Sequence, residues 1–236
     1  MNKSISLGII VPFYNEEKFL EESVSRLLKL EIVDQIVMVD DCSTDNSYLK
    51  AEKIFKDNNK ILLTKTKSNK GKGAAVKKGL SLISTSHVII HDADLEYFPD
   101  DIPEMFEKVS IDKDLLILGS RTIGTKERKS IYFYTYFGNK VLTMLFSILN
   151  NYKVSDIASC YWLVKVDSLK KINIREKGFA IEVEVLSKFI KNKIEIIEVP
   201  IRYEGRSYED GKKIKLRDGV KIFFKILKYC KINIFI

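Results

Sequence analysis

The sequence lacks several features that would place it in common protein classes. Its 236 residues contain no stretch of about 18 residues without a charged side chain, so no transmembrane helix is predicted. The residues before Leu7 are few and polar, and no signal peptide is expected. The three cysteines, Cys42, Cys160 and Cys230, are odd in number and have no metal-like spacing, which indicates reduced thiols in a cytosolic protein rather than a disulfide framework.

Four prolines, no low-complexity tract and no internal repeat argue against a long flexible linker or a repeat array. The length and a hydrophobic content of 45% fit one large domain with a sizeable core. The formal net charge is +8, which favours an anionic partner: nucleic acid, anionic lipid or a phosphorylated substrate.

Apolar runs and helical periodicities alternate through the first half of the chain. Strands are predicted at 5–11 (ended by Pro12), 35–39, 60–64, 88–91 and 115–118, and helices at 16–30 (with Asn15 as N-cap), 43–56, 72–82 and 102–109. This alternation predicts an α/β fold with a mainly parallel sheet flanked by helices. Ligands bind such sheets at the carboxyl ends of the strands.

The pattern changes after Gly119. A long aromatic helix is predicted at 131–149, a strand at 159–166, a helix at 181–190, an extended segment at 194–203 and a closing helix at 215–230. The closing helix places Lys221, Lys225 and Lys228 beside apolar residues, which is typical of a helix on a membrane surface. For this helix and for the aromatic helix at 131–149, packing against the sheet is the alternative to contact with a membrane.

Three carboxylates alternate directly after the strand at 88–91. Asp92, Asp94 and Glu96 can converge on one point, because side chains two residues apart on an extended chain share a face. Hard oxygen ligands of this kind suit Mg²⁺ or Mn²⁺, whose open positions substrate phosphates can fill. A solvated acidic turn is the alternative.

Polar residues also follow the first three strands. Those after the first strand can bind the edge of a base or a sugar. Asp40 and Asp41, after the second strand, can accept a hydrogen bond from a base or a ribose. Helix capping is the alternative for both segments. After the third strand, Gly71, Lys72 and Gly73 open a helix in a way that suits a phosphate. This loop matches neither the Walker pattern nor the dinucleotide fingerprint.

Cationic residues gather in two later segments. Arg121 and Arg128 follow the fifth strand, and Arg206 and Lys213 lie in a glycine-bearing loop that could close over a charged ligand. Solvated basic loops are the alternative in both places.

Together these motifs resemble family 2 glycosyltransferases. Segments 11–16, 40–43, 69–73 and 92–96 have the order and spacing of that family, and segments 119–121, 155–156, 178–184 and 206–213 are similar to the polyprenyl-phosphate mannose and glucose synthases. The resemblance covers about residues 5–215 and implies a GT-A fold with a smaller acceptor-side extension. It divides the chain into a catalytic domain at 1–212, with a nucleotide-binding half at 1–120 and an acceptor half at 121–212, and a basic amphipathic helix at 213–236.

The resemblance also implies roles for individual residues. The nucleotide-sugar would be bound by Pro12, Tyr14, Asn15, Glu16, Asp40, Asp41, Lys72, Asp92, Ala93, Asp94, Arg206 and Lys213. The metal, Mg²⁺ or Mn²⁺, would be held by Asp92, Asp94 and Glu96, although relatives of the mannose synthase type often have glutamine where Glu96 stands. The acceptor would be bound by Arg121, Arg128 and Glu182, and catalysis would rest on Asp94, Arg121, Asp156 and Arg206.

The expected activity is metal-dependent, inverting transfer of a hexose from a UDP- or GDP-sugar to a polyprenyl phosphate. The expected location is the cytoplasmic, inner face of a membrane, with peripheral attachment and no nucleic-acid partner. A different acceptor is possible within the same family: an enzyme that extends a saccharide would need a base such as Asp156, Glu182 or Glu184. A nucleotidyltransferase would also use a parallel sheet with acidic metal ligands, and a non-enzymatic basic module would account for the net charge alone.

Overall fold

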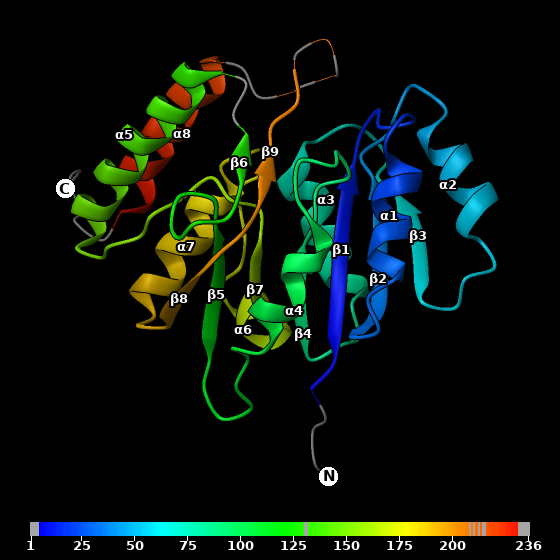
Figure 1. Cartoon of the computed structure of the whole chain (residues 1–236), viewed down its shortest axis with the longest axis horizontal. Coiled ribbons are helices and arrows are strands. Elements are labelled where there is room, and N and C mark those ends of the chain that lie inside the picture. Colours follow the sequence, from blue (N-terminus) through cyan, green and yellow to red (C-terminus); the bar gives the residue numbers. More distant parts are fainter. Residues whose placement is uncertain are drawn as a thin grey trace.

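The computed structural model describes residues 5–129, 132–207, 209, 211, 213 and 216–230, and its centre is a seven-stranded sheet in the order β3-β2-β1-β4-β7-β5-β8 (Figure 1). The strands are β1 (Leu7–Phe13), β2 (Val33–Asp40), β3 (Ile61–Lys65), β4 (His87–Ile90), β5 (Leu115–Ser120), β7 (Trp162–Lys165) and β8 (Glu195–Pro200). Two short strands, β6 (Arg128–Lys129) and β9 (Tyr203–Glu204), pair in parallel beside this sheet.

The helices are α1 (Leu20–Leu28), α2 (Ser47–Phe55), α3 (Lys72–Leu82), α4 (Ile102–Phe106), α5 (Phe133–Asn150), α6 (Val166–Lys171), α7 (Ile181–Lys191) and α8 (Leu216–Tyr229), with a 3-10 turn η1 (Pro99–Asp101) before α4. The predicted α/β class and mainly parallel sheet are confirmed. In the sheet, β7 is the strand that runs antiparallel to both of its neighbours, β4 and β5.

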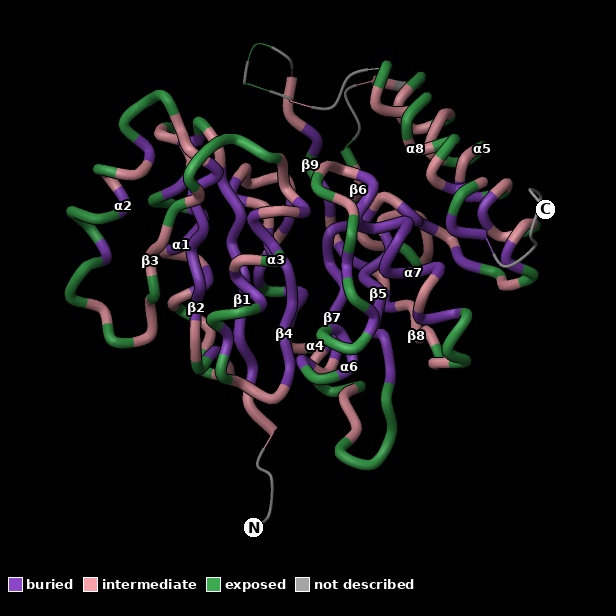
Figure 2. The backbone as a smooth tube through the Cα atoms, turned by 180° about the vertical axis from the view of Figure 1, so that it is seen from behind, coloured by how far each residue is buried: buried purple, intermediate pink, exposed green. Residues whose placement is uncertain are grey.

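Both faces of the sheet are covered by helices (Figure 2). Alternate residues of β1 serve opposite faces: Ile10 joins the core formed with α3, α5, α7 and α8, and Ile9 joins the core formed with α1, α2 and α4. Ile9 and Ile10 are both fully buried, as expected for a strand in the middle of a two-sided sheet.

Several local predictions are corrected by the structure. β1 continues through Pro12 to Phe13, because β4 pairs only with Leu7–Ile10 and Pro12 therefore needs no amide hydrogen on that side. Asn15 is not an N-cap: its φ is 51°, its side chain bonds with Thr44, and α1 begins only at Leu20.

Helices α5 and α8 pack side by side at one side of the molecule (Figure 1). Among the described residues, no helix is both long and apolar enough to cross a membrane. The predicted closing helix corresponds to α8, and residues 214, 215 and 231–236 of the predicted 213–236 segment lie outside the described residues.

The glycine loop before α3 is shaped by a close backbone contact. Gly71 has a φ of 94°, which suits glycine. At Gly73, an added Cβ would lie 2.4 Å from the carbonyl oxygen of Glu176. The amide of Ala74 also donates to the carbonyl of Lys177 at 3.1 Å. These glycines therefore let the loop pack against residues 176–178, a use that the sequence pattern does not distinguish from an approach to phosphate.

We expect Gly73→Ala to lower the free energy of unfolding by about 1–3 kcal/mol, because the new methyl group would collide with backbone. Gly219→Ala is the matched control: this glycine also lies in a helix, and its added Cβ would meet nothing within 4 Å. The control should be stabilising by up to about 1 kcal/mol. Urea unfolding of both variants measures the difference, and equal stabilities would contradict the packing role.

Candidate active site

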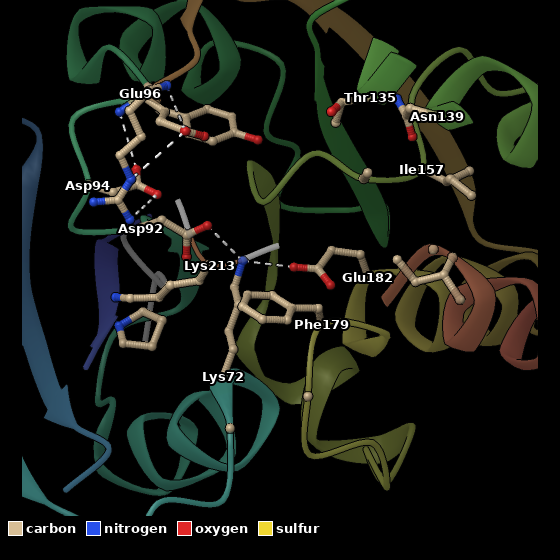
Figure 3. Close-up of a pocket in the computed structure, with 18 of the residues that line it drawn as sticks. Lys72, Asp92, Asp94, Glu96, Thr135, Asn139, Ile157, Phe179, Glu182 and Lys213 are labelled. Carbon is tan, nitrogen blue, oxygen red and sulfur yellow. Dashed lines mark hydrogen bonds and ion pairs between the residues drawn. The ribbon is translucent and has the colours of Figure 1, made fainter. Parts of the chain in front are cut away.

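A pocket of about 570 Å³ opens at the carboxyl ends of β1, β4 and β5 (Figure 3). It collects most of the residues that the sequence singled out: Pro12, Tyr14, Glu16, Asp41, Lys72, Asp92, Ala93, Asp94, Glu96, Arg121, Arg128, Glu182, Arg206 and Lys213. Asn15, Asp40 and Asp156 are not in its lining. The position follows from the topology, since the carboxyl ends of the parallel strands share one edge of the sheet.

Lys72, the first residue of α3, lies between two carboxylates. Its ammonium nitrogen is 2.8 Å from Asp92 Oδ2 and 2.8 Å from Glu182 Oε1. Burial alone would lower the pKa of Lys72, but Asp92 and Glu182 outweigh it and raise that pKa well above its usual value. Glu182 is itself buried, and its Oε2 has no hydrogen-bond partner among the described residues.

Asp94 lies where negative charge exceeds positive charge. Burial raises the pKa of Asp94 to about 8, and the carboxylates of Glu96 and Asp92 add to this effect. Arg206 opposes it from 3.4 Å. A carboxyl group with such a pKa marks a place where an added cation would be stabilising.

The expected set of three metal ligands is not formed. In the described part of the chain, no group of three Asp, Glu, His or Cys side chains is placed to hold a metal ion. Both oxygens of Glu96 accept hydrogen bonds from the protein: Oε2 from the Tyr203 hydroxyl at 2.6 Å, and Oε1 from the Arg206 amide at 2.9 Å. Asp92 and Asp94 offer hard oxygen ligands that fit a divalent cation taking its remaining ligands from phosphates.

The late basic loop reaches the end of β1. The carboxylate of Glu16 is buried and accepts hydrogen bonds from Arg206 at 2.8 and 2.9 Å. Lys213 contacts the same carboxylate and also the carbonyl of Tyr14. Burial would lower the pKa of Arg206, but its carboxylate neighbours raise it. The two cations expected to bind a diphosphate are thus held by an acidic side chain of the protein.

The two aspartates after β2 organise the loops around them. Asp41 lines the pocket and accepts from the amides of Lys70, at 3.0 Å, and Gly71. Asp40 accepts from the amide of Ser43 at 3.0 Å. Their assignment to a nucleotide base stays a prediction.

The guanidinium groups of Arg121 and Arg128 also line the pocket. Arg121 binds Asp156 through two contacts, Nε–Oδ2 at 2.7 Å and Nη2–Oδ1 at 2.8 Å. Arg128 donates to the Arg121 carbonyl at 3.2 Å, and its Nε is buried with no hydrogen-bond partner among the described residues. Burial and the charge of Arg121 lower the pKa of Arg128. Two cations share one nearby carboxylate here, so this place suits an anion.

Sequence reasoning missed the polar face of α5. Thr135 and Asn139 point toward the pocket (Figure 3), whereas the sequence pattern had been interpreted only as an apolar stripe. Their spacing of four residues was the available signal. Glu184, a candidate base, is fully buried outside the pocket lining, where it accepts from the amides of Arg175 and Glu176.

Comparison with known proteins gives consistent results. The model of "Glycosyl transferase family 2" matches residues 8–173. The chain is 30% identical over 240 residues to a UDP-N-acetylglucosamine–dolichyl-phosphate N-acetylglucosaminyltransferase of Methanococcus voltae, covering 93% of this chain and 94% of that protein. It is 27% identical to a dolichyl-phosphate beta-glucosyltransferase of Saccharomyces cerevisiae, covering 94% and 73%.

Among solved structures, the chain is similar to glucosyl-3-phosphoglycerate synthase of Mycobacterium tuberculosis in complex with Mn²⁺, UDP-glucose and phosphoglyceric acid. The TM-score is 0.74 at 16% identity, with 97% of this chain and 81% of that chain covered. At this identity the similarity supports the fold, and the predicted GT-A architecture is confirmed.

We expect Asp94→Asn to stabilise the protein at pH 8 in the presence of a chelator. The folded-state pKa of about 8 lies above that of an unfolded aspartate, so stability is lost as pH rises from about 4 to about 8. Asparagine does not ionise, so the Asp94→Asn variant does not lose stability in this way. Its advantage should grow over that range to at least about 1 kcal/mol, since one pKa unit is worth about 1.4 kcal/mol. Urea unfolding at several pH values measures it.

Asp156→Asn is a control of opposite sign. Burial would raise the pKa of Asp156, but Arg121 lowers it, so this carboxylate stabilises the fold above pH 4. Its loss should destabilise the protein by about 3–5 kcal/mol at pH 7, because it leaves a buried guanidinium unpaired. Destabilisation by both variants at pH 8 would refute the charge excess at Asp94.

Proposed function

Since the chain belongs to glycosyl transferase family 2, we propose that this glycosyltransferase transfers a hexose from a UDP- or GDP-sugar to a polyprenyl phosphate at a membrane surface, with inversion at the sugar. The names of its relatives support a dolichyl-phosphate acceptor and a nucleotide-sugar donor. The donor would occupy the end of the pocket around Asp92, Asp94 and Lys72.

One observation carries the choice of acceptor. The two guanidinium groups of Arg121 and Arg128 lie in the same pocket as an apolar end between α5, α7 and α8. The apolar lining residues on and next to these helices include Leu142, Ile157, Val183 and Ile222. A ligand with an anionic head and a hydrocarbon chain matches a pocket that contains both cations and apolar side chains.

The charges suit the transfer step. As the bond between sugar and phosphate breaks, negative charge grows on the leaving diphosphate, and Lys72 and Arg206, which both line the pocket, would stabilise it. A divalent cation held by Asp92 and Asp94 would add to this stabilisation. The acceptor phosphate is already an anion near pH 7 and needs no strong base. Arg121 and Arg128 would hold it on the face of the sugar opposite the leaving group.

The alternative acceptor is a saccharide hydroxyl, and Glu182 is the observation that favours it. A hydroxyl needs a base, and Glu182 lines the pocket with a buried oxygen that has no partner among the described residues. Asp156 suits this task poorly, because its pKa is lowered and both its oxygens bind Arg121.

Assays of sugar transfer from UDP- and GDP-sugars with Mn²⁺ should yield a polyprenyl-phosphate sugar. Arg128→Gln should raise KM for the acceptor by at least about tenfold and leave KM for the donor nearly unchanged, because a charge-assisted contact is worth about 1.5–3 kcal/mol. Arg26→Gln, which removes an exposed guanidinium of α1, is the matched control. Transfer to saccharides alone would contradict the proposed acceptor.

The proposed membrane surface consists of the exposed faces of α5 and α8. Phe137, Met144, Ile148 and Phe224 are each about 60% exposed, an unusual concentration for large apolar side chains. Basic residues of α8 flank this face, with Lys221 at 68% side-chain exposure. Apolar side chains beside lysines match an anionic lipid surface. The same two helices line the apolar end of the pocket, so a lipid acceptor could enter from the bilayer.

Replacing Phe137 and Phe224 together by Asp should weaken binding to vesicles of phosphatidylglycerol and phosphatidylcholine by at least about tenfold, because apolar contact is lost and negative charge is added. Leu49→Asp is the control, since Leu49 is 63% exposed on the distant helix α2. Sedimentation with vesicles measures binding. Unchanged sedimentation of the double variant would exclude this surface.

A further inference from the structure

We infer that Tyr136 and Asn139, on the helix proposed to lie on the membrane, are positioning residues that fix the two guanidinium groups for the acceptor phosphate. This inference rests on the proposed function, because it concerns how that site is held in shape. Tyr136 acts on Arg128, and Asn139 acts on Arg121 through Asp156.

Asn139 holds Asp156 from the side of α5. Its amide nitrogen donates to Asp156 Oδ1 at 2.9 Å, and the same oxygen accepts from Arg121 Nη2 at 2.8 Å. Asp156 is fully buried, so its orientation depends on these neighbours. The asparagine therefore fixes the carboxylate, and the carboxylate fixes the plane of the Arg121 guanidinium. Such a fork leaves Arg121 few alternative orientations.

Tyr136 holds Arg128 from one turn earlier on the same helix. The Arg128 guanidinium carbon lies 4.4 Å from the centre of the Tyr136 ring, within the range of a cation–π contact. Arg128 also donates to the Arg121 carbonyl, so these two contacts fix the side chain while its Nε has no partner among the described residues. A buried donor without a partner is costly unless a ligand satisfies it.

Helix α5 thus has two faces with linked tasks. Phe137, Val141, Met144 and Ile148 are exposed on one side, whereas Tyr136 and Asn139 contact the cation site on the other. A shift of α5 would move both contacts together. The geometry of the acceptor site therefore depends on the position of α5. The exposed face of the same helix is the surface proposed to contact the lipid.

The test uses the full chain and a short polyprenyl phosphate that dissolves in water, so that membrane binding does not affect the result. Asn139→Asp keeps the size of the side chain but places a carboxylate against Asp156. Tyr136→Leu removes the ring. Each should raise KM for the acceptor by at least about tenfold, with KM for the donor changed less than about twofold. Tyr136→Phe keeps the ring and should retain acceptor KM within about twofold of the wild type.

Ser147→Ala is the control for general loosening of α5. It removes the two hydrogen bonds between the Ser147 hydroxyl of the same helix and the backbone of Val154, outside the pocket lining. It should leave both KM values unchanged. Equal rises of donor and acceptor KM in the Asn139 and Tyr136 variants, or acceptor KM values like the wild type, would overturn the inference.

Failure of the proposed function gives a different result. In that case the wild-type chain itself would not transfer sugar to the polyprenyl phosphate. The same variants would then be titrated with inorganic phosphate and followed by phosphorus NMR. Weaker binding of phosphate by at least about tenfold in Asn139→Asp and Tyr136→Leu would still support the positioning role, and unchanged binding would refute it.

Discussion

The buried ion pairs of Lys72 are the interaction on which the rest of the site depends. Lys72 joins Asp92, at the end of β4, to Glu182, at the start of α7, and so links segments separated by 90 positions in the sequence. Charges removed from water are tolerated when they are paired closely, and removing one partner of such a pair is strongly destabilising. Gly73 packs closely on the backbone of Glu176, so the first turn of α3 lies against the segment before α7. This packing places Lys72 between Asp92 and Glu182.

The other charged contacts follow the same plan. Glu16 with Arg206, and Arg121 with Asp156, each join a strand end of the sheet to a later segment of the chain. The pocket is therefore built from paired charges contributed by distant parts of the sequence. Charges are incompletely paired at Asp94 and at Arg128, and we propose that ligands bind at these two places. One has an excess of negative charge and the other an excess of positive charge, which matches a metal–diphosphate and a phosphate.

Much of this architecture follows from the sequence, for reasons visible in single elements. The bounds of α3 agree with those predicted, because Gly71 and Gly73 mark its start. The direction of β7 does not follow from apolar periodicity, which is the same for parallel and antiparallel strands. Asn15 was misjudged as an N-cap because its partner, Thr44, comes from another part of the chain. The contact of Glu96 with Tyr203 could not be predicted for the same reason. Asn139 was missed because a few polar residues in a mostly apolar helix give little signal until Asp156 is placed beside one of them.

The contact of Glu16 with Arg206 and Lys213 has a consequence for selectivity. A ligand that binds these two cations must compete with a carboxylate that is already attached to the protein and therefore has a high effective concentration. An anion with a single charge offers no more than Glu16 does. A diphosphate offers more charge and more oxygen atoms, and so it can compete where inorganic phosphate or a small carboxylic acid is at a disadvantage. The acidic side chain thus sets a threshold of charge for entry, which would keep this end of the pocket clear of the abundant small anions of the cell.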